Sequence, residues 1–383
     1  MAQYSVWDTT SVTSTIQEKL VREDVSDLLS NLFPTDAPAQ QALGRVPMSS
    51  TFTERPIDFH TNIDRDSTVF GTGGSQVHAR EEGFDYSTTR TPSYPERLIS
   101  VAQIVGERFE VSRTDRAVSH YAISDRFAYE ALKVTEQVVN DFELDFWWSP
   151  GSAREGVSID GNVVRQTQGI CHWVCKTGLE RTKIGTGVAA SFPDGHGNEF
   201  GTDGGVLNDS MSYAFDAGGV GLDSGMFKEK LMAAWWQLTG RTGGATGFCG
   251  SRLKALFSKF ALSAGLGSVN ERTISAESAK VVDRVDLYDT DHGIISMNLC
   301  RYLDIPDQTT VFTQSTGSTT VAWDEVLILM QPRYFNIGVL RGTGYSPLAQ
   351  NGDFDQGLIV GEQSMVCTNP LGAAALVNCG GVS

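Results

Sequence analysis

The sequence predicts an α+β protein in which one long amphipathic helix stands among sheets and loops. The segment from Ser124 to Ser149 has the longest helical periodicity in the chain. The C-terminal third alternates between strand-like runs and turns. Glycine is abundant, with 40 residues in 383, which favours turns and loops over a helical bundle. We therefore expect a spine helix against which sheets are laid.

The predicted spine helix covers residues 125–148. Ser124 or Asp125 can cap its first turn, and Pro150-Gly151 ends it. Apolar residues recur at steps of three and four and share one face: Phe127, Ala131, Val134, Val138, Phe142 and Phe146. The acidic residues are expected mostly on the other sides: Glu130, Glu136, Asp141, Glu143 and Asp145. Phe142 should thus be buried, and Glu143 should lie away from the buried face.

Two segments before this helix lack a core of their own. The apolar periodicity of residues 16–33 predicts a short amphipathic helix, which ends at Pro34. Residues 51–60 and 97–111 alternate like strands around a polar stretch at 62–94, which indicates a long hairpin with a hydrophilic tip. An isolated hairpin is marginally stable in water, so this excursion should lie on another molecule.

Residues after the spine helix predict shorter elements. Residues 162–174 are strand-like, and 177–225 form an irregular insertion rich in Gly, Asp and Ser. Helices are predicted from Asp223 or Ser224 to 238 and over 252–264, followed by two strands joined through Asp291-His292-Gly293. The last strand-like runs are 326–330, 335–340, 357–369 and 373–378.

Composition excludes several classes of protein. Hydrophobic residues make up 40% of the chain, so a packed core is expected. The net charge of −16 argues against a protein that grips nucleic acid, because neutralising phosphates requires Lys and Arg. No apolar run reaches the length of a membrane span, and the N-terminus does not have the pattern of a secretory signal. The six cysteines are widely spread, which is typical of a reduced, cytoplasmic protein.

The candidates for chemistry are weak. Cys171-His172-Trp173-Val174-Cys175 has metal-ligand residue types, but a structural zinc site needs a second pair, so buried strand cysteines are the favoured interpretation. The glycine-rich segments 240–247 and 71–74 lack the Lys-Ser/Thr of a phosphate loop.

Side chains on the helices also have ordinary explanations. Asp141 and Asp145 lie four residues apart and have the spacing of an acid/base pair, but a solvated face or salt bridges across a subunit contact is the favoured explanation. Trp147-Trp148 and Trp235-Trp236 are interpreted as core or interface anchors. No Gly-x-Ser-x-Gly elbow is present. We therefore predict no catalytic, cofactor-binding or metal residues, no cofactor and no enzyme.

Short motifs in chain order give the sequence a family resemblance. They are Asp27-Leu28-Leu29 to Pro34-Thr35-Asp36-Ala37-Pro38 with Ala42-Leu43-Gly44, Gly243-Gly244 with 251–256, 285–293, 348–353, Val360-Gly361-Glu362, and 369–373. In this order they resemble the major capsid proteins of tailed bacteriophages, which share the Hong Kong 97-type fold. One departure is His292, where an aromatic residue is common. The insertion at 177–225 has no counterpart.

The resemblance implies a role for each part of the chain. Residues 1–48 would be the N-terminal arm, 49–107 the E-loop, 108–170 the P-domain with its spine helix at 125–148, 171–344 the A-domain with the insertion 177–225, and 345–383 the strands that return to the P-domain. The implied function is a major capsid protein that self-assembles into hexamers and pentamers and forms an icosahedral head shell around double-stranded DNA, without sequence-specific binding. Scaffold, portal and decoration proteins are the implied further partners, with no membrane. The protein would be made in the host bacterial cytoplasm and reside in the virion.

Some members of this fold link subunits by isopeptide bonds between an E-loop lysine and an asparagine of a neighbour. Residues 20–132 contain no lysine, and arginine stays charged and cannot act as the nucleophile. A non-covalent shell is therefore expected. The alternatives are an encapsulin-like or other phage shell or tube subunit and an enzyme of unknown type.

Overall fold

A computed structural model of the chain describes residues 36–57, 82, 96–118, 123–152, 156–159, 161–174, 213–233, 235–236, 244–263, 286–305, 308–314, 317–350 and 352–379. The predicted helix at 16–33, nearly all of the hairpin tip at 62–94 and the first part of the insertion at 177–225 lie outside these residues. The chain falls into two compact units: one of 1–35, 107–136 and 345–359, and a larger one of 36–106, 137–344 and 360–383.

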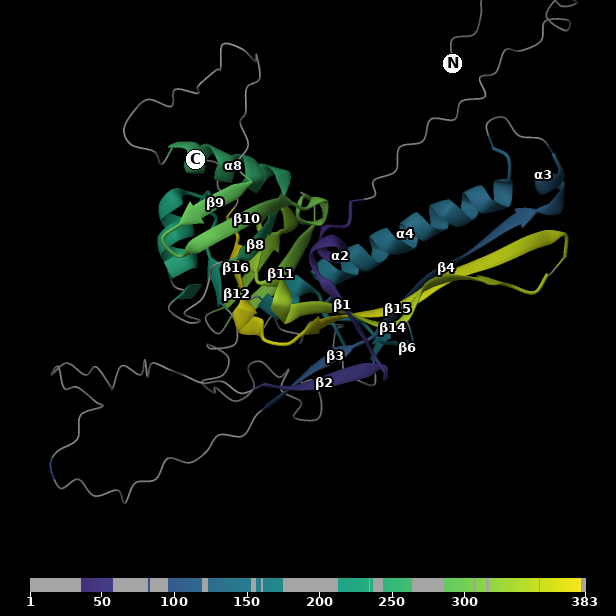
Figure 1. The fold of residues 1–383 in the computed structure, drawn as a ribbon, viewed down its shortest axis with the longest axis horizontal. Helices are drawn as coiled ribbons and strands as arrows, with labels where there is room; N and C mark the ends of the chain where they lie inside the picture. The colour runs from purple at the N-terminus through teal and green to yellow at the C-terminus, as the bar shows by residue number, and fades with distance from the viewer. Residues whose placement is uncertain are drawn as a thin grey trace, which may run out of the picture. The chain divides into compact units, whose positions relative to one another are not determined.

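The predicted spine helix is confirmed as α4, Arg126–Trp148 (Figure 1). Asp125 caps it, because its Oδ1 accepts the main-chain N–H of Phe127 at 3.0 Å. The buried apolar face is also as predicted along the C-terminal half, where Val138, Phe142 and Phe146 are buried. The placement of Glu143 is wrong, since this carboxylate is fully buried.

A six-stranded sheet forms the core of the larger unit, in the order β7-β16-β13-β8-β10-β9. Figure 1 shows β16, β8, β10 and β9 of this sheet side by side, with α8 near them. The bounds are β7 Tyr213–Asp216, β8 Ala245–Cys249, β9 Leu287–Thr290, β10 Gly293–Leu299, β13 Leu327–Met330 and β16 Ala373–Val377. β10 is parallel to β8, while β13 is antiparallel to both β8 and β16. Strands β8, β13 and β16 are almost wholly buried, as expected for a central position with both faces covered.

One cluster of buried side chains joins this sheet to two helical segments. They are α8, Ser251–Ser263, and a π-helix, Met226–Met232, which is followed by the buried Trp235. Leu253 and Phe257 of α8 and Phe227 of the π-helix belong to the same core as Ile295 and Leu329 of the sheet. The predicted capping role of Asp223 is confirmed, since its Oδ1 accepts the main-chain N–H of Met226 at 2.6 Å.

The long C-terminal strands belong to a second sheet of four strands, in the order β1-β14-β15-β4. Its strands are β1 Gly44–Pro47, β4 Gln103–Ser112, β14 Phe335–Pro347 and β15 Phe354–Cys367. β1 is parallel to β14, with Gly44 opposite Asn336. The run predicted as one strand at 97–111 is in fact two, because it divides at Ala102 into β3 and β4.

The remaining described strands form three two-stranded sheets. β2 Phe52–Ile57 pairs antiparallel with β3 Glu96–Val101, so the base of the predicted hairpin is confirmed. β5 Val157–Ile159 pairs with β6 Asn162–Val164, and β11 Thr309–Gln314 with β12 Gly317–Ala322.

The remaining helices are short. They are α2 Pro38–Ala42, α3 Arg113–Ala117 and α5 Ile170–Val174, with single 3-10 turns at Arg301–Leu303, Trp323–Glu325, Pro332–Tyr334 and Pro370–Gly372. α5 corrects the strand predicted around Cys171, because all five of its residues are buried and strand-like composition does not separate a buried helical turn from a strand.

Candidate functional site

Glu143 of α4 holds the short helix α2 in place. Its Oε1 accepts the main-chain N–H of Ala39 at 2.6 Å, and its Oε2 accepts that of Gln40 at 3.2 Å. The first N–H groups of a helix have no partner within it, and a carboxylate is a favourable acceptor for them. The Gln40 side-chain amide also donates to the carbonyl of Val139 on α4, at 3.0 Å. Residues 36–42, which belong to the predicted N-terminal arm, are thereby attached to α4.

The surroundings of Glu143 contain donors rather than a cation. The Trp147 indole Nε1–H donates to Oε1 at 2.9 Å, so the donors of Ala39, Gln40 and Trp147 to this carboxylate are all neutral N–H groups. Burial raises the pKa of Glu143 above its ordinary value, and the N–H donors partly oppose this rise. The site is therefore built for an acceptor-only side chain.

Asp145 performs a similar task for the start of β4. Its Oδ2 accepts the side-chain amide of Gln103 at 2.6 Å. The amide oxygen of Gln103 accepts the main-chain N–H of Thr167 at 3.0 Å, so one glutamine connects α4 to a second segment. The pKa of Asp145 is raised to about 6, first by burial and also by the nearby Asp141, while the hydrogen bond from Gln103 opposes the rise. Gln103 lies just after the β2–β3 hairpin, so α4 holds the base of that hairpin as well.

Glu143 and Asp145 hold their two partners from different sides of the helix. Residues two apart on an α-helix do not face each other, so one carboxylate is directed at α2 and the other at β4. Helix α4 therefore fixes the first described residues after segment 1–35 and the base of the β2–β3 hairpin, whose strands lead to residues 58–95. We call Glu143 and Asp145 the anchor carboxylates.

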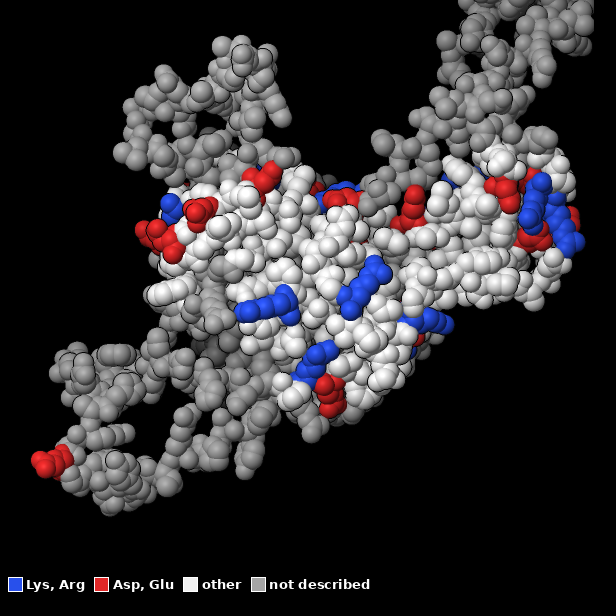
Figure 2. All heavy atoms as spheres, in the orientation of Figure 1, with Lys and Arg blue, Asp and Glu red and all other residues white. Residues whose placement is uncertain are grey.

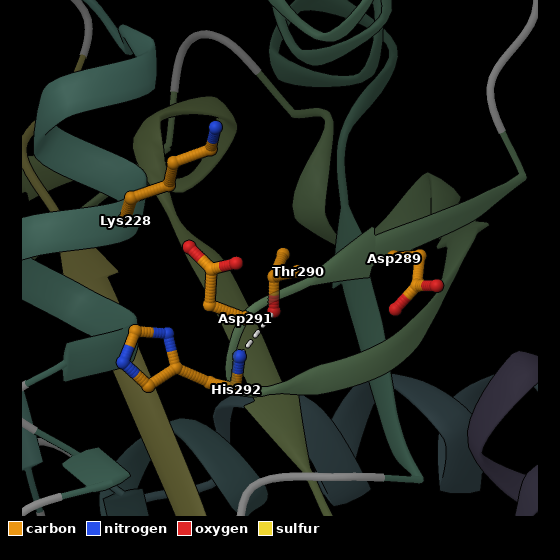
Figure 3. Close-up of a pocket in the computed structure, with 5 residues that line it drawn as sticks. All are labelled: Lys228, Asp289, Thr290, Asp291 and His292. Atoms are coloured by element: carbon orange, nitrogen blue, oxygen red, sulfur yellow. Dashed lines mark hydrogen bonds between the residues drawn. The ribbon is translucent and has the colours of Figure 1, made fainter.

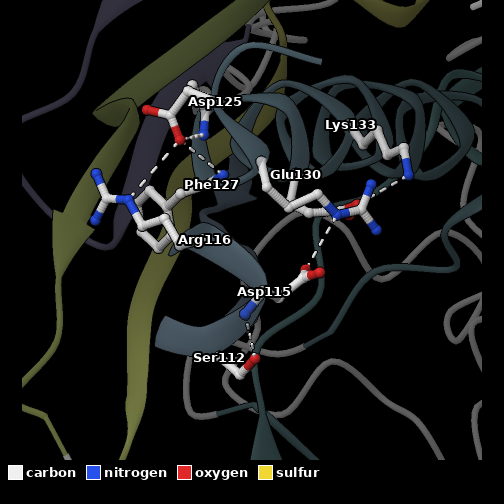
Figure 4. A network of polar contacts seen from close by, with 9 residues as sticks. Ser112, Asp115, Arg116, Asp125, Phe127, Glu130 and Lys133 are labelled. Atoms are coloured by element: carbon white, nitrogen blue, oxygen red, sulfur yellow. Dashed lines mark hydrogen bonds and ion pairs between the residues drawn. The ribbon is translucent and has the colours of Figure 1, made fainter. Parts of the chain in front are cut away.

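The smaller unit contains a polar network around the start of α4 (Figure 4). Arg116 of α3 donates to Asp355 at 2.8 Å and lies 3.9 Å from Asp125. Arg126 pairs with Glu130 at 2.9 Å, and Lys133 pairs with the same carboxylate at 3.0 Å. The guanidinium of Arg116 lowers the pKa of Asp355. These contacts are largely exposed, so each contributes little to stability by itself.

An aromatic cluster packs beside this network. Phe109 of β4 lies 5.0 Å from Phe127 of α4, and Tyr345 of β14 lies 6.2 Å from Phe127 in an edge-to-face arrangement. The guanidinium of Arg116 sits 5.4 Å from the Phe127 ring. Four segments of the smaller unit are therefore joined by packing as well as by charge.

A shallow hollow of about 310 Å³ lies at the turn between β9 and β10 (Figure 3). It is lined by Lys228, Asp289, Thr290, Asp291 and His292. The hydroxyl of Thr290 donates to the Gly293 carbonyl at 2.8 Å and accepts the His292 main-chain N–H at 3.3 Å, which stabilises the turn. Figure 3 shows the side chain of Asp289 directed away from the others, so the residues do not converge on one point.

The sequence-derived metal candidate does not assemble in the part of the chain that the structure describes. Cys171 and His172 are buried on α5, and Cys175 lies outside the described residues. Among the described residues, no group of three or more Cys, His, Asp or Glu is placed to hold a metal ion. The five described cysteines are all buried thiols: Cys171, Cys249, Cys300, Cys367 and Cys379.

The structure also places most of the other residues that the sequence singled out. Asp145 accepts a hydrogen bond from Gln103 and is only partly exposed, so of the two predicted explanations the solvated face is wrong at that position. Trp147 packs against Phe248 at 5.1 Å, and Trp148 stacks on Trp323 at 4.3 Å, which confirms their role as core anchors. Trp235 is also buried, whereas Trp236 is half exposed. Segments 71–74 and 240–243 lie outside the described residues.

Sequence reasoning missed the anchor carboxylates because they break the helical pattern. Glu143 stands between Phe142 and the Phe146-Trp147 pair, so its neighbours in sequence are among the most buried residues of α4. A carboxylate within such an aromatic run is the signal that a buried acceptor is required.

On the face drawn in Figure 2, the described Lys and Arg side chains stand singly or beside acidic ones and form no continuous basic stripe. Within the described part of the chain, none of the helices has the length and hydropathy of a membrane-spanning segment.

Comparison with known proteins gives a family match over nearly the whole chain. The family model described as "SU10 major capsid protein" matches residues 8–380. No curated protein matches the chain. Among solved structures, the chain is similar to the capsid of the empty GTA particle, with a TM-score of 0.52, 11% identity and coverage of 96% of this chain and 99% of that one.

Two further structures are similar to the same extent. The capsid of the native GTA particle gives a TM-score of 0.51, 12% identity and coverage of 96% and 99%. The capsid of Myoviridae phage XM1 gives a TM-score of 0.50, 10% identity and coverage of 95% and 98%. At these identities the likeness is one of fold.

Proposed function

The chain belongs to the SU10 major capsid protein family, and on this premise we propose that its copies assemble as hexamers and pentamers into an icosahedral phage head around double-stranded DNA. Family membership makes the protein a tailed-phage capsid subunit of the Hong Kong 97-type fold, which forms shells and resides in the virion. The arrangement into two kinds of capsomer and the enclosed genome are the proposal. So are synthesis in the bacterial cytoplasm and cooperation with scaffold, portal and decoration proteins.

The observation that carries the proposal is the pair of anchor carboxylates. Glu143 attaches the residues that follow segment 1–35, and Asp145 the base of the β2–β3 hairpin that leads to residues 58–95, to a single helix. A subunit that reaches its neighbours through extensions needs fixed departure points, because a loose base would let the extension point in many directions. We accordingly assign residues 1–48 to an N-terminal arm, 49–107 to an E-loop, 108–170 and 345–383 to a P-domain, and 171–344 to an A-domain.

Charge supports a container that does not bind its contents tightly. The net charge of −16 leaves no general attraction for phosphates, and a packed genome needs a wall that lets the DNA move. The proposal contains no catalytic step.

The proposal also specifies a shell without covalent links. Residues 20–132 contain no lysine, so the proposed E-loop lacks the amine that an isopeptide bond requires. Lys133, the first lysine after this stretch, is paired with Glu130 on α4. The shell is therefore held by arm, loop and surface contacts.

Purified particles test both parts of this proposal. Electron microscopy should show closed shells with five- and six-fold capsomers, and boiled, reduced particles should give one gel band near 41.5 kDa. Tubes, or cargo protein inside the shell in place of DNA, would favour the tube or encapsulin-like alternatives. A ladder of covalent multimers would contradict the non-covalent shell while leaving the capsid assignment intact.

A further inference from the structure

The β5–β6 hairpin is an unusual surface element of the larger unit. Its two strands form a sheet of their own, which no other described strand joins. Val157 pairs with Val164, Ser158 with Val163, and Ile159 with Asn162. Four of these six residues are aliphatic and β-branched. Such a composition is typical of strands that lie against another surface.

Both faces of the hairpin expose aliphatic side chains. Directly paired residues share a face, so Val157, Ile159 and Val164 lie on one side and Val163 on the other. Val163 is 72% exposed, Ile159 39% and Val164 38%. An isolated two-stranded hairpin is marginally stable in water, so cover by another surface would stabilise these exposed residues.

Charge indicates which surface this is. Strands β5 and β6 contain no charged residue, although Asp160 stands between them in sequence, while the chain as a whole carries −16. Copies of one acidic protein repel one another wherever their charged surfaces meet, and uncharged aliphatic patches are the places where they can approach. In a shell-forming family each chain is surrounded by further copies of itself.

We propose that the β5–β6 hairpin is a contact site for a second copy of this chain. The covered residues are Ile159 and Val164 on one face and Val163 on the other, so the neighbour receives the hairpin between two of its own surfaces or in a groove. This inference rests on the shell-forming role and adds to it a named contact outside the two extensions.

Val163→Asp tests the contact, with Val220→Asp as the matched control. Val220 is also exposed, at 55%, and lies in a turn outside the hairpin. Unassembled subunits of both variants should melt as the wild type does, because neither side chain is buried. Val163→Asp should lower the yield of particles at least tenfold, whereas Val220→Asp should assemble normally. Normal assembly of Val163→Asp, or loss of its subunit melting transition, would overturn the proposal.

Hydrogen exchange gives a second measurement that needs no variant. Amides of 156–164 should exchange at least tenfold more slowly in wild-type particles built from this chain alone than in free subunits. Equal exchange rates, or protection that arises only when another protein is bound, would overturn the proposal. Failure of the wild-type chain to form any particle, even with a scaffold, would count against the shell-forming role itself and is therefore distinguishable.

Discussion

Glu143→Gln should destabilise the folded subunit, although the two side chains have nearly the same size. Oε1 of Glu143 accepts two N–H groups, from Ala39 and Trp147, and Oε2 accepts a third from Gln40. Glutamine supplies only one acceptor oxygen. If it keeps the two bonds to Oε1, its NH₂ group faces the N–H of Gln40, donor against donor.

The magnitude follows from these contacts. A buried donor without an acceptor costs about 1–3 kcal/mol, and bonds to a charged acceptor are stronger than those to a neutral one. Removing a buried charge recovers part of its desolvation, which already shows as the raised pKa of Glu143. We therefore expect a loss of about 1–3 kcal/mol for glutamine and a larger loss for Glu143→Leu, which leaves all three donors unpaired.

Denaturant unfolding of unassembled subunits measures this loss, with Glu229→Gln as control. Glu229 is exposed, so the same chemical change there should shift stability by less than about 0.5 kcal/mol. Hydrogen exchange adds a local measurement, since the amides of Ala39 and Gln40 should lose protection in Glu143→Gln. Unchanged stability together with unchanged protection of both amides would refute the idea that Glu143 holds α2.

Three further changes have expected outcomes. The pKa of Asp145 is raised to about 6, so the folded state binds a proton at this carboxylate more readily than the unfolded chain does. The stabilisation that Asp145 contributes should therefore fall as the pH rises from about 4 to 6 and stay level above 7. Denaturant unfolding should show this as a fall, over the same range, in the unfolding free energy of wild type minus that of Asp145→Asn. Gly169→Ala should lower the melting temperature by several degrees, because a Cβ there would lie 2.6 Å from the Trp147 carbonyl oxygen, whereas Gly342→Ala, with nothing within 4 Å, should not. Phe142→Asp should cost about 4 kcal/mol or more in denaturant unfolding, since Phe142 is buried and stacks on Phe146, whereas Leu132→Asp on the same helix, 57% exposed, should cost less than about 1 kcal/mol.

The elements that could be predicted are those whose structure depends only on residues close together in the sequence. The apolar stripe of α4, the cap at Asp125 and the buried runs of β13 and β16 each depend on a periodicity or a single turn. The short helix α5 could not be separated from a strand, because five buried residues fit either structure. The division of the run at Ala102 could not be predicted from the nearby sequence either. Strands β3 and β4 have the same alternating composition, but they pair with strands of different sheets.

The anchor carboxylates depend on partners far away in sequence. Ala39 is 104 residues from Glu143, and Gln103 is 42 residues from Asp145. A helical pattern says only which side of α4 a residue occupies, and most acidic residues on such a helix are solvated. What the sequence did contain was an acidic residue among Phe142, Phe146 and Trp147, where a carboxylate is tolerated only if donors reach it.

The chemistry of the two anchors suits a subunit that must keep its shape in different ionic conditions. Each joins a carboxylate to neutral N–H groups: the main chain of Ala39 and Gln40, the indole of Trp147 and the amide of Gln103. Salt screens attraction between opposite charges at the surface, as in the exposed pair of Arg116 and Asp355, but acts much less on buried hydrogen bonds. The attachment of the two extensions thus depends on burial and geometry.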